Sequence, residues 1–395
     1  MKILHTVEFY DPSVGGMQEV VKQLSERLVE LGHDVTVATT KLPNRRSSEI
    51  NGVKIVEFDI SGNLVRGLSG EIEKYKKFLV ESNFGVVVNF AAQQWATDIA
   101  LDILGEIKAK KVFVPTGFSG FYLPEYQSYF RKMKDRIKKY DMDVFLSNDY
   151  RDINFARDVG VDRKKITIIP NGANEKEFLS KSKSKIDVRE RLDTPEEHFL
   201  ILHVGSHTGV KGHKEAIEIF SRAKIKNATF LMVGNIFGGG CSVYCPAKAL
   251  LFKFSPRRLR DGKRLVVTQL KREETVAAYQ AADLFLFPSN IECSPIVLFE
   301  AMASKTPFLT ADVGNSAEIV EWSGGAGIVL PTDKNKEGFA RVRIPESIKI
   351  LEDIYRDEKR WEKMAKDGFS AWKKRFTWEK IAKEYEKLYE SLANS

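Results

Sequence analysis

Short β-branched, apolar segments alternate with helical patterns along most of this chain, and this alternation limits its fold more than any other sequence feature. After the first segment, KILHTVEF, apolar residues recur at helical spacing from Val20 to Leu31, and the segment DVTVATT follows. Strand, helix and strand in this order are typical of parallel strands with helices packed on their sheet. Further strand-like segments are GVVVNF, KKVFVP, DVFLSN, FLILHVGS, ATFLMVGN, RLVVTQL, DLFLFPS, PFLTAD and AGIVL. The alternation predicts an α/β protein with doubly wound sheets.

A polar stretch rich in lysine and serine divides the predicted strands into two groups. It covers residues 179–198, LSKSKSKIDVRERLDTPEEH, and indicates a linker between domains. We therefore predict a Rossmann-like N-terminal domain over residues 1–178 and a Rossmann-like C-terminal domain over residues 199–376. The tail, residues 377–395, has apolar residues on one helical face and is predicted to form a last amphipathic helix.

The composition is that of a globular protein, because 43% of the 395 residues are hydrophobic. No run of about 18 apolar residues is present, and the start MKILHTVEF lacks the features of a signal peptide, which predicts a cytoplasmic protein. Three cysteines, Cys241, Cys245 and Cys293, cannot form a disulfide framework. No Cys or His pair follows Cys241 and Cys245 at zinc-site spacing, so we predict two loop or helix thiols and no metal.

The net charge of +8 predicts an anionic partner, although charge alone does not choose among a nucleotide, a phospholipid and a nucleic acid. The segment YFRKMKDRIKKY, residues 129–140, combines basic residues with Tyr129, Met133, Ile137 and Tyr140 at helical spacing. Two interpretations stay open for this amphipathic helix. It rests on an anionic membrane surface, or it is a surface helix whose apolar stripe packs on the core.

Two glycine-containing loops follow predicted strands, and the carboxyl ends of parallel strands are where ligands bind. In DPSVGGMQEV, Gly15 and Gly16 would let backbone N–H groups approach a phosphate, although a tight turn uses the same residues. In HVGSHTGVKGHKEAIEIF, the Lys211 ammonium could neutralise a diphosphate, and Ser206 or Thr208 could donate a hydrogen bond to it. The alternative is a solvated surface lysine.

A third loop, FPSNIECSPIVLFEAMASK, opens a helix after the strand DLFLFPS. Ser294 is predicted as its N-cap and Pro295 as its first residue, since the missing N–H of proline costs nothing there. The N–H groups of Ile296 and Val297, at the positive end of the helix dipole, can then hold a phosphate.

Two glutamates flank this helix start. Glu292 lies just before the anion site, and Glu300 lies about a turn and a half inside the helix among apolar neighbours. Carboxylates only accept hydrogen bonds, so the two suit a ligand rich in hydroxyl groups, such as a ribose and a second sugar. The spacing alone is weak support, because two glutamates often fall this far apart by chance.

The run from Glu292 to Lys305 resembles the E-x7-E segment of glycosyltransferase family 4, a group of retaining GT-B enzymes that use nucleotide-sugar donors. Further segments resemble that family in its own order along nearly the whole chain. They are GGMQEVVKQLSERLVELGHDVTVAT, KITIIPNGANEKEF, VGSHTGVKGHKEAIEIF, AAYQAADLFLFPS and TPFLTADVGNSAEIV.

The resemblance implies a GT-B fold, in which two doubly wound Rossmann-like domains face a cleft and the C-terminal helix packs back on the N-terminal domain. It implies that the C-terminal domain binds a nucleoside-diphosphate sugar as co-substrate, and that no divalent metal or other cofactor is needed. Glu292 would contact the transferred sugar, Lys211 the diphosphate, and Glu300 the ribose. The remaining donor-binding residues implied by the motifs are Gly15, Gly16, Gly205, Ser206, Ser294, Pro295, Ile296 and Val297.

The chain departs from the family at two positions. Many members have an arginine where this chain has Ser206, so one diphosphate cation is missing unless Lys214, His207 or another basic residue replaces it. Many also have a histidine where this chain has Thr116, so a histidine general base is not expected. The run DMD, Asp141 to Asp143, is predicted to start a strand and not to bind a metal.

The resemblance predicts a retaining glycosyltransferase that moves a sugar to a hydroxyl of a saccharide, glycolipid or other acceptor in glycan or cell-surface polysaccharide biosynthesis. We favour same-face attack, in which the leaving phosphate takes the acceptor proton, because it needs no protein base. The loops AAQQWATD and TGFSGFYLPEYQSYF suggest Gln93, Thr116 and Tyr122 as acceptor-binding residues.

Other functions stay open on the sequence alone. A GT-B nucleotide-sugar epimerase or hydrolase would act on the donor without an acceptor. A basic nucleic-acid-binding protein would fit the charge, but the sequence has no nucleic-acid motif and no interleaved aromatic and basic residues, so no nucleic-acid partner is predicted. The predicted location is the cytoplasm, with peripheral contact at the inner face of the membrane through residues 129–140.

Overall fold

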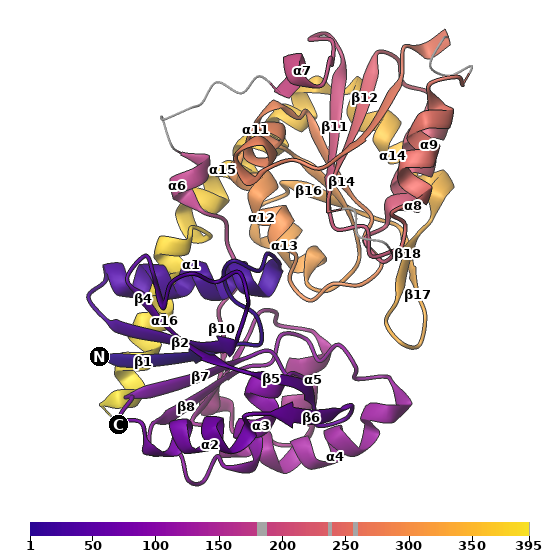
Figure 1. Cartoon of the computed structure of the whole chain (residues 1–395). Coiled ribbons are helices and arrows are strands. Elements are labelled where there is room, and N and C mark those ends of the chain that lie inside the picture. Colours follow the sequence, from indigo (N-terminus) through magenta and orange to yellow (C-terminus); the bar gives the residue numbers. More distant parts are fainter. Residues whose placement is uncertain (180–187, 236–238, 256–259, 395) are drawn as a thin grey trace. The chain divides into compact units, whose positions relative to one another are not determined.

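A computed structural model gives two compact units, each with a parallel sheet covered by helices (Figure 1). The first unit comprises Met1–Asn171 and Trp378–Ser395, and the second comprises Gly172–Thr377. The structure describes residues 1–179, 188–235, 239–255 and 260–394. The predicted α/β class is therefore confirmed. Within these described residues, no helix is long and apolar enough to cross a membrane.

The first unit has its earliest strand in the middle of an eight-stranded sheet, counted over the described residues, with the order β10-β9-β8-β7-β1-β2-β4-β3. All neighbours pair in parallel except β3 and β4. The strands are β1 (Lys2–Thr6), β2 (Asp34–Thr40), β3 (Glu49–Ile50), β4 (Val53–Phe58), β7 (Val86–Phe90), β8 (Lys110–Val114), β9 (Met142–Phe145) and β10 (Ile166–Ile168), with a separate hairpin of β5 (Ile60–Asn63) and β6 (Gly67–Gly70). The helices are α1 (Gly16–Glu30), α2 (Ile72–Glu81), α3 (Trp95–Asp102), α4 (Gln127–Arg136), α5 (Arg151–Asp158) and α16 (Trp378–Ala393), with short 3-10 helices η1 (Pro124–Tyr126), η2 (Ile137–Lys139) and η3 (Arg163–Lys165).

The second unit has a six-stranded parallel sheet within its described residues, in the order β13-β12-β11-β14-β15-β16. The strands are β11 (Phe199–Val204), β12 (Ala228–Val233), β13 (Arg264–Thr268), β14 (Leu284–Phe287), β15 (Phe308–Ala311) and β16 (Gly327–Leu330), and β17 (Thr332–Lys334) pairs antiparallel with β18 (Ala340–Val342). The helices are α6 (Glu175–Phe178), α7 (Val188–Arg191), α8 (His213–Arg222), α9 (Tyr244–Phe252), α11 (Arg272–Ala281), α12 (Ile296–Ala303), α13 (Ser316–Trp322), α14 (Ile344–Arg356) and α15 (Glu358–Arg375). The first strand is again central, and the order reverses between β11 and β14, as in Rossmann folds.

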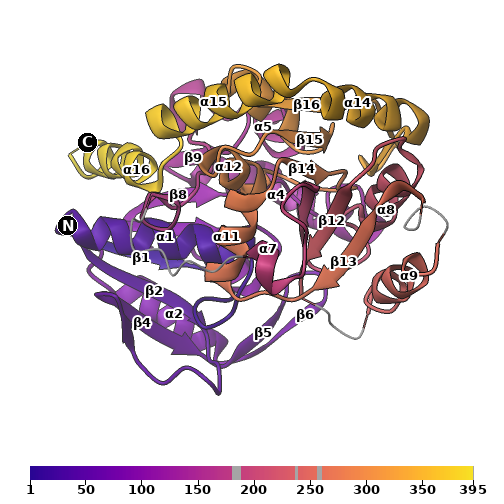
Figure 2. The same ribbon diagram turned by 90° about the horizontal axis from the view of Figure 1, so that it is seen from above.

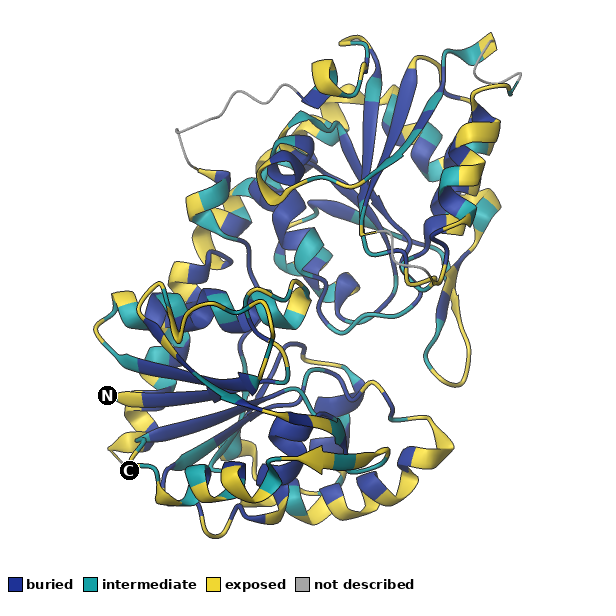
Figure 3. Cartoon of the chain, viewed as in Figure 1, coloured by how far each residue is buried: buried dark blue, intermediate teal, exposed yellow. Residues whose placement is uncertain are grey.

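The central strands of both large sheets are buried on both faces, and their sequences reflect this (Figure 3). In β14, Leu284 and Leu286 pack in one core cluster with residues of α8, and Phe285 and Phe287 pack in another with residues of α12. Successive side chains of a strand point to opposite faces, so a strand covered on both sides is apolar throughout. Burial of each such phenylalanine contributes about 2–3 kcal/mol to the free energy of unfolding.

The division between the units falls after Asn171, before the predicted end of the N-terminal domain at residue 178. Ala173 donates its N–H to the carbonyl of Phe376 at 3.0 Å, and Phe178 packs in a core cluster of the second unit. The short helix α7 lies within the predicted linker, 179–198. Residues 180–187 of that linker lie outside the described residues.

The C-terminal helix α16 belongs to the first unit, which confirms the predicted return of the tail (Figure 2). It packs on α1, and the Tyr389 hydroxyl lies 3.4 Å from Nε2 of His5 in β1. His33 Nε2 lies 2.8 Å from the Glu386 carboxylate. The apolar face of this helix is thus part of the core of the first unit.

The basic helix predicted over residues 129–140 forms α4 and η2. Its apolar stripe, Tyr129, Met133, Ile137 and Tyr140, is buried in a core cluster of the first unit. The interpretation as a surface helix with its stripe on the core is therefore confirmed, and the apolar face is not available for insertion into a membrane.

Candidate active site

The loops after β11 and β14 meet where the strand order of the second unit reverses. Asn290 donates its N–H to the carbonyl of Val210 at 3.0 Å, which joins the two loops through their backbones. Gly212 has φ of 71°, and a Cβ atom there would lie 1.9 Å from the carbonyl oxygen of Pro288. Only glycine fits this contact, so the sequence at residue 212 sets how closely the loops approach.

This contact places Lys211 against Glu292. The Lys211 ammonium lies 2.6 Å from the Glu292 carboxylate, and Ser289 Oγ donates to the same oxygen at 2.8 Å. The side chains are 29% and 12% exposed, so the pair is partly shielded but open to a ligand. The two predicted catalytic residues are therefore neighbours, although 81 positions separate them in the chain.

The helix after these residues, α12, begins one residue later than predicted. Pro295 is the N-cap, with φ of −71° and ψ of 110°, and no side chain caps the helix. The prediction of Ser294 as N-cap is wrong, because Pro295 has an extended backbone and leaves Ile296 as the first helical residue. Ile296 and Val297 are in the first turn, where N–H groups have no partner within the helix, so the predicted anion site keeps its donors.

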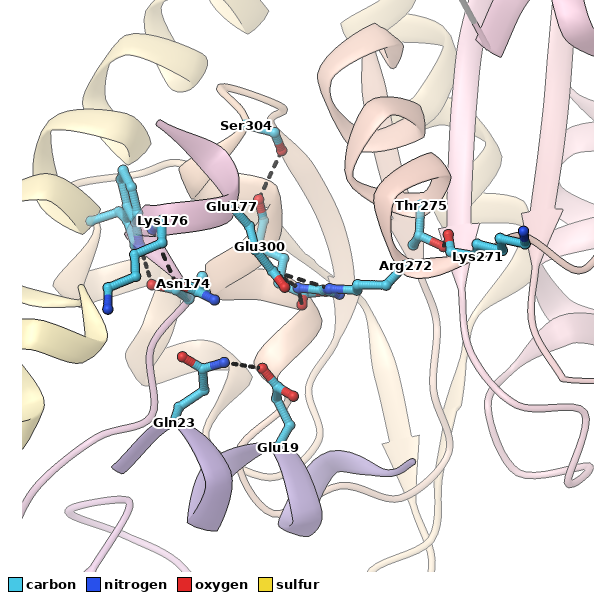
Figure 4. Close-up of polar contacts among 12 residues, drawn as sticks. Glu19, Gln23, Asn174, Lys176, Glu177, Lys271, Arg272, Thr275, Glu300 and Ser304 are labelled. Carbon is cyan, nitrogen blue, oxygen red and sulfur yellow. Dashed lines mark hydrogen bonds and ion pairs between the residues drawn. The ribbon is translucent and has the colours of Figure 1, made fainter. Parts of the chain in front are cut away.

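Glu300 is buried in α12 and forms an ion pair that the sequence did not predict (Figure 4). Its carboxylate lies 2.6 Å from the guanidinium of Arg272, at the start of α11, and the same guanidinium lies 2.6 Å from Glu177 of α6. Tyr279, also on α11, has a pKa well above its ordinary value, first because of burial and then because of the Glu300 charge. Contacts among residues of α6, α11 and α12 thus fix the position of Glu300, the predicted ribose-binding residue.

The structure bears on which basic residue could replace the arginine that many family members have at the position of Ser206. His207, one suggested replacement for the missing arginine, is buried, and burial lowers its pKa, so its ring is neutral near pH 7. Lys214, the other suggestion, places its ammonium 5.3 Å from the centre of the Tyr244 ring. His207 therefore does not supply the second cation.

In the first unit, Gly15 and Gly16 lie at the start of α1, as predicted. Gly15 has an extended backbone with φ of 178°. The preceding loop is held by Arg45, whose guanidinium donates to the carbonyls of Asp11 at 2.7 Å and Tyr10 at 3.1 Å and pairs with Glu57. The sequence pattern did not indicate a role for Arg45, because its partners, two backbone carbonyls and Glu57, are distant from it in the chain.

The predicted acceptor residues Gln93 and Thr116 lie at the carboxyl ends of the neighbouring strands β7 and β8. Both have positive φ, 64° and 58°, which is a strained backbone for residues other than glycine and is common at functional sites. Gln93 Oε1 accepts from the N–H of Gly120 at 3.0 Å. Tyr122 is exposed, with the guanidinium of Arg151 5.4 Å from its ring centre.

The run Asp141 to Asp143 starts strand β9, as predicted. Asp143 is fully buried within the strand, and burial raises its pKa well above the ordinary value. Asp141 accepts the backbone N–H of Lys111 at 2.7 Å. A carboxyl that is fully buried inside a strand does not suit metal binding.

Comparisons with known proteins agree with this architecture. The chain is 24% identical to an uncharacterized glycosyltransferase of Methanocaldococcus jannaschii, over 98% of each chain. The structure is similar to that of sucrose-phosphate synthase from Thermosynechococcus elongatus, with a TM-score of 0.78 at 19% identity, over 100% of both chains. It is also similar to Anabaena HepE in complex with UDP-glucose, with a TM-score of 0.72 at 16% identity, over 99% of this chain and 100% of that one.

Two family models match the chain one after the other. The model of Glycosyltransferase Family 4 matches residues 14–177, and the model of Glycosyl transferases group 1 matches residues 184–368. The second match includes the Lys211, Glu292 and Glu300 positions. The chain therefore belongs to the group 1, family 4 glycosyltransferases, enzymes that transfer glycosyl groups, and it has their GT-B fold.

Proposed function

We propose that this glycosyltransferase moves a sugar from a nucleoside-diphosphate sugar to a hydroxyl of a saccharide or glycolipid acceptor, with retention of the anomeric configuration. The observation that carries the proposal is the Lys211–Glu292 pair, 2.6 Å apart beside the start of α12. One cation, one partly buried carboxylate and a helix N-terminus fit a ligand that joins a diphosphate to a sugar. The complex of Anabaena HepE with UDP-glucose supports this class of donor.

Each residue has a distinct task in the proposed reaction. Lys211 and the N–H groups of Ile296 and Val297 stabilise the charge that grows on the leaving diphosphate. Glu292 accepts a hydrogen bond from a hydroxyl of the transferred sugar. Glu300 accepts hydrogen bonds from ribose hydroxyls with the lone pairs that Arg272 does not use. Fixed charges of this kind can take the place of a divalent metal at the leaving group, so we propose transfer without metal.

We further propose same-face attack. The bond between the anomeric carbon and the phosphate oxygen breaks, the acceptor oxygen bonds to the same face, and the acceptor proton passes to the leaving phosphate. No protein base is needed, which agrees with threonine at position 116.

A screen of nucleotide sugars tests the proposal. One nucleoside-diphosphate sugar should raise the melting temperature, and a saccharide or lipid acceptor should then be needed for its turnover. NMR of the product should show the anomeric configuration of the donor. Donor consumption that does not depend on an acceptor, or an inverted product, would contradict the proposal, as would a covalent sugar on Glu292 detected by mass spectrometry.

Contact of α4 and η2 with an anionic membrane stays a prediction. Because their apolar stripe is buried, only exposed basic side chains such as Lys132, Lys134 and Lys138 are available for contact. Sedimentation with anionic liposomes should therefore show binding at low salt that disappears at high salt. No binding at low salt would contradict it.

A further inference from the structure

A cluster of histidines and cysteines lies next to the loop that carries Lys211. His207, His213 and Cys241 each offer one ligand atom, and these three atoms all lie within 4.8 Å of one another. The three residues are buried, at most 2% exposed. Lys211 lies between the two histidines in the segment HTGVKGH after β11, and Cys241 lies in the segment CSVYC after β12.

Each histidine of the cluster has one ring nitrogen without a hydrogen-bond partner among the described residues. His207 Nε2 and His213 Nδ1 are buried and have no partner among the described residues, and the same is true of Nε2 of the adjacent His203. His213 Nε2 lies 3.1 Å from the carbonyl of Gly205, so it donates its proton there and leaves the lone pair on Nδ1. A histidine that donates one nitrogen to a carbonyl and turns the other into a buried cluster has the arrangement of a metal ligand.

Cys241 adds a thiol to the two imidazoles, and the thiol of Cys245 lies next to that of Cys241. Cys241 Sγ lies 3.4 Å from His207 Nδ1, and Cys245, one helical turn later, is hydrogen-bonded to Cys241 through its side chain.

We propose that His207, His213 and Cys241 bind one Zn²⁺ ion, and that the Cys245 side chain, which lies next to Cys241, turns to supply the fourth ligand. Nitrogen and sulfur donors favour zinc over Mg²⁺ or Ca²⁺. Two neutral imidazoles and two thiolates form a closed tetrahedral set whose charge cancels that of the ion, and binding releases the two thiol protons. A closed site is structural, so it leaves the chemistry of sugar transfer to other residues.

The backbone already brings the two ligand segments together. Cys241 donates its N–H to the carbonyl of His207 at 3.1 Å, and His207 donates to the carbonyl of Asn235 at 3.2 Å. Gly240 has φ of 59°, and a Cβ atom there would lie 2.2 Å from the His207 carbonyl oxygen. The ion would fix both ends of the segment on which Lys211 lies.

Metal analysis of the full-length protein, purified without a metal-affinity column from zinc-supplemented cells, tests the proposal. We expect about one zinc ion per chain and, after replacement by Co²⁺, the visible bands of a tetrahedral cobalt–thiolate site. The double variant Cys241→Ser/Cys245→Ser and the variant His213→Gln should lose the metal. Matched controls, Cys293→Ser and His198→Gln, should keep it, because Cys293 and His198 lie outside the cluster.

A second test uses the wild-type protein, so that its result does not depend on whether the variants fold. Treatment with 1,10-phenanthroline should lower its melting temperature, while the non-chelating 1,7 isomer should not. Equal melting temperatures, a folded wild-type protein without stoichiometric zinc, or equal zinc in the double variant and in Cys293→Ser would overturn the proposal. A Cys241–Cys245 disulfide in the native protein, detected by peptide mass, would also overturn it.

Discussion

Arg272 and Glu300 form an ion pair at 2.6 Å in which the carboxylate side chain is only 6% exposed. Arg272→Ala would leave the Glu300 charge without this partner, and breaking a fully buried pair costs about 3–5 kcal/mol. Because the Arg272 side chain is 41% exposed, we expect a smaller loss of about 1–2 kcal/mol in the free energy of unfolding.

Urea unfolding measures this loss. The control is Arg222→Ala, which breaks the exposed Arg222–Glu218 pair and should change stability by less than about 0.5 kcal/mol. In the double variant Arg272→Ala/Glu300→Gln, the loss should be smaller than the sum of the two single losses. Additive losses would show that the pair is not coupled.

Lys211→Ala and Glu292→Ala should each lower kcat by about 10²-fold or more, since each removes a charge from the proposed donor site. The folded state should persist, because both side chains lie at loops and not in a core cluster. Steady-state kinetics with the identified donor, together with circular dichroism, checks this. Lys226→Ala, at an exposed lysine of the same unit, is the control, and turnover at its level in either variant would contradict the site assignment.

Gly212→Ala should destabilise the protein and weaken donor binding, because the added Cβ would overlap the Pro288 carbonyl. Gly324 offers a matched control, since its φ of 69° is nearly that of Gly212 but nothing lies within 4 Å of an added Cβ. Gly324→Ala should therefore cost only the backbone strain, about 1 kcal/mol. Calorimetry and donor titration compare the variants, and equal effects would show that the loop contact at residue 212 is loose.

Asp98 should make the stability of the protein depend on pH. Burial raises its pKa from 3.8 to about 6, despite hydrogen bonds from the Leu64 N–H and the Tyr129 hydroxyl. Between these values the folded protein keeps a proton that the unfolded chain has lost, so stability falls as pH rises from about 4 to about 6 and is then constant. The fall amounts to at most about 3 kcal/mol.

Asp98→Asn should lack this contribution. Urea unfolding of both proteins between about pH 4 and 7 gives the difference in their free energies as a function of pH. We expect that difference to change across the window and to level off above it. Parallel curves would show that Asp98 titrates normally.

The features that could be predicted from the sequence are those that repeat along the chain, namely the strands, the helices and the loops after the strands. The alternation of strands and helices led to both sheets, and the carboxyl ends of strands led to Lys211 and Glu292, because loops at neighbouring parallel strands must meet. Local backbone geometry was harder to predict from the sequence. The N-cap of α12 is Pro295 and not Ser294, since Pro295 has an extended backbone and the first helical residue is Ile296.

Contacts between distant segments were not predictable from pattern. Arg272 begins a helix with the ordinary sequence KREE, and nothing in it indicates that Glu177 and Glu300 lie within reach. The sequence pattern did not indicate that the histidines of HTGVKGH lie beside Cys241, because they precede the cysteines in the chain and only the pairing of β11 with β12 brings the two segments together.

The division of the chain also bears on how the protein is made. The first unit is built from a segment before the second unit and a segment after it, and α16 supplies part of its core. A ribosome releases α16 only after the whole second unit has emerged. The second unit can therefore fold during synthesis, whereas the unit begun first stays incomplete, with the α16-facing side of α1 uncovered, until α16 has been released.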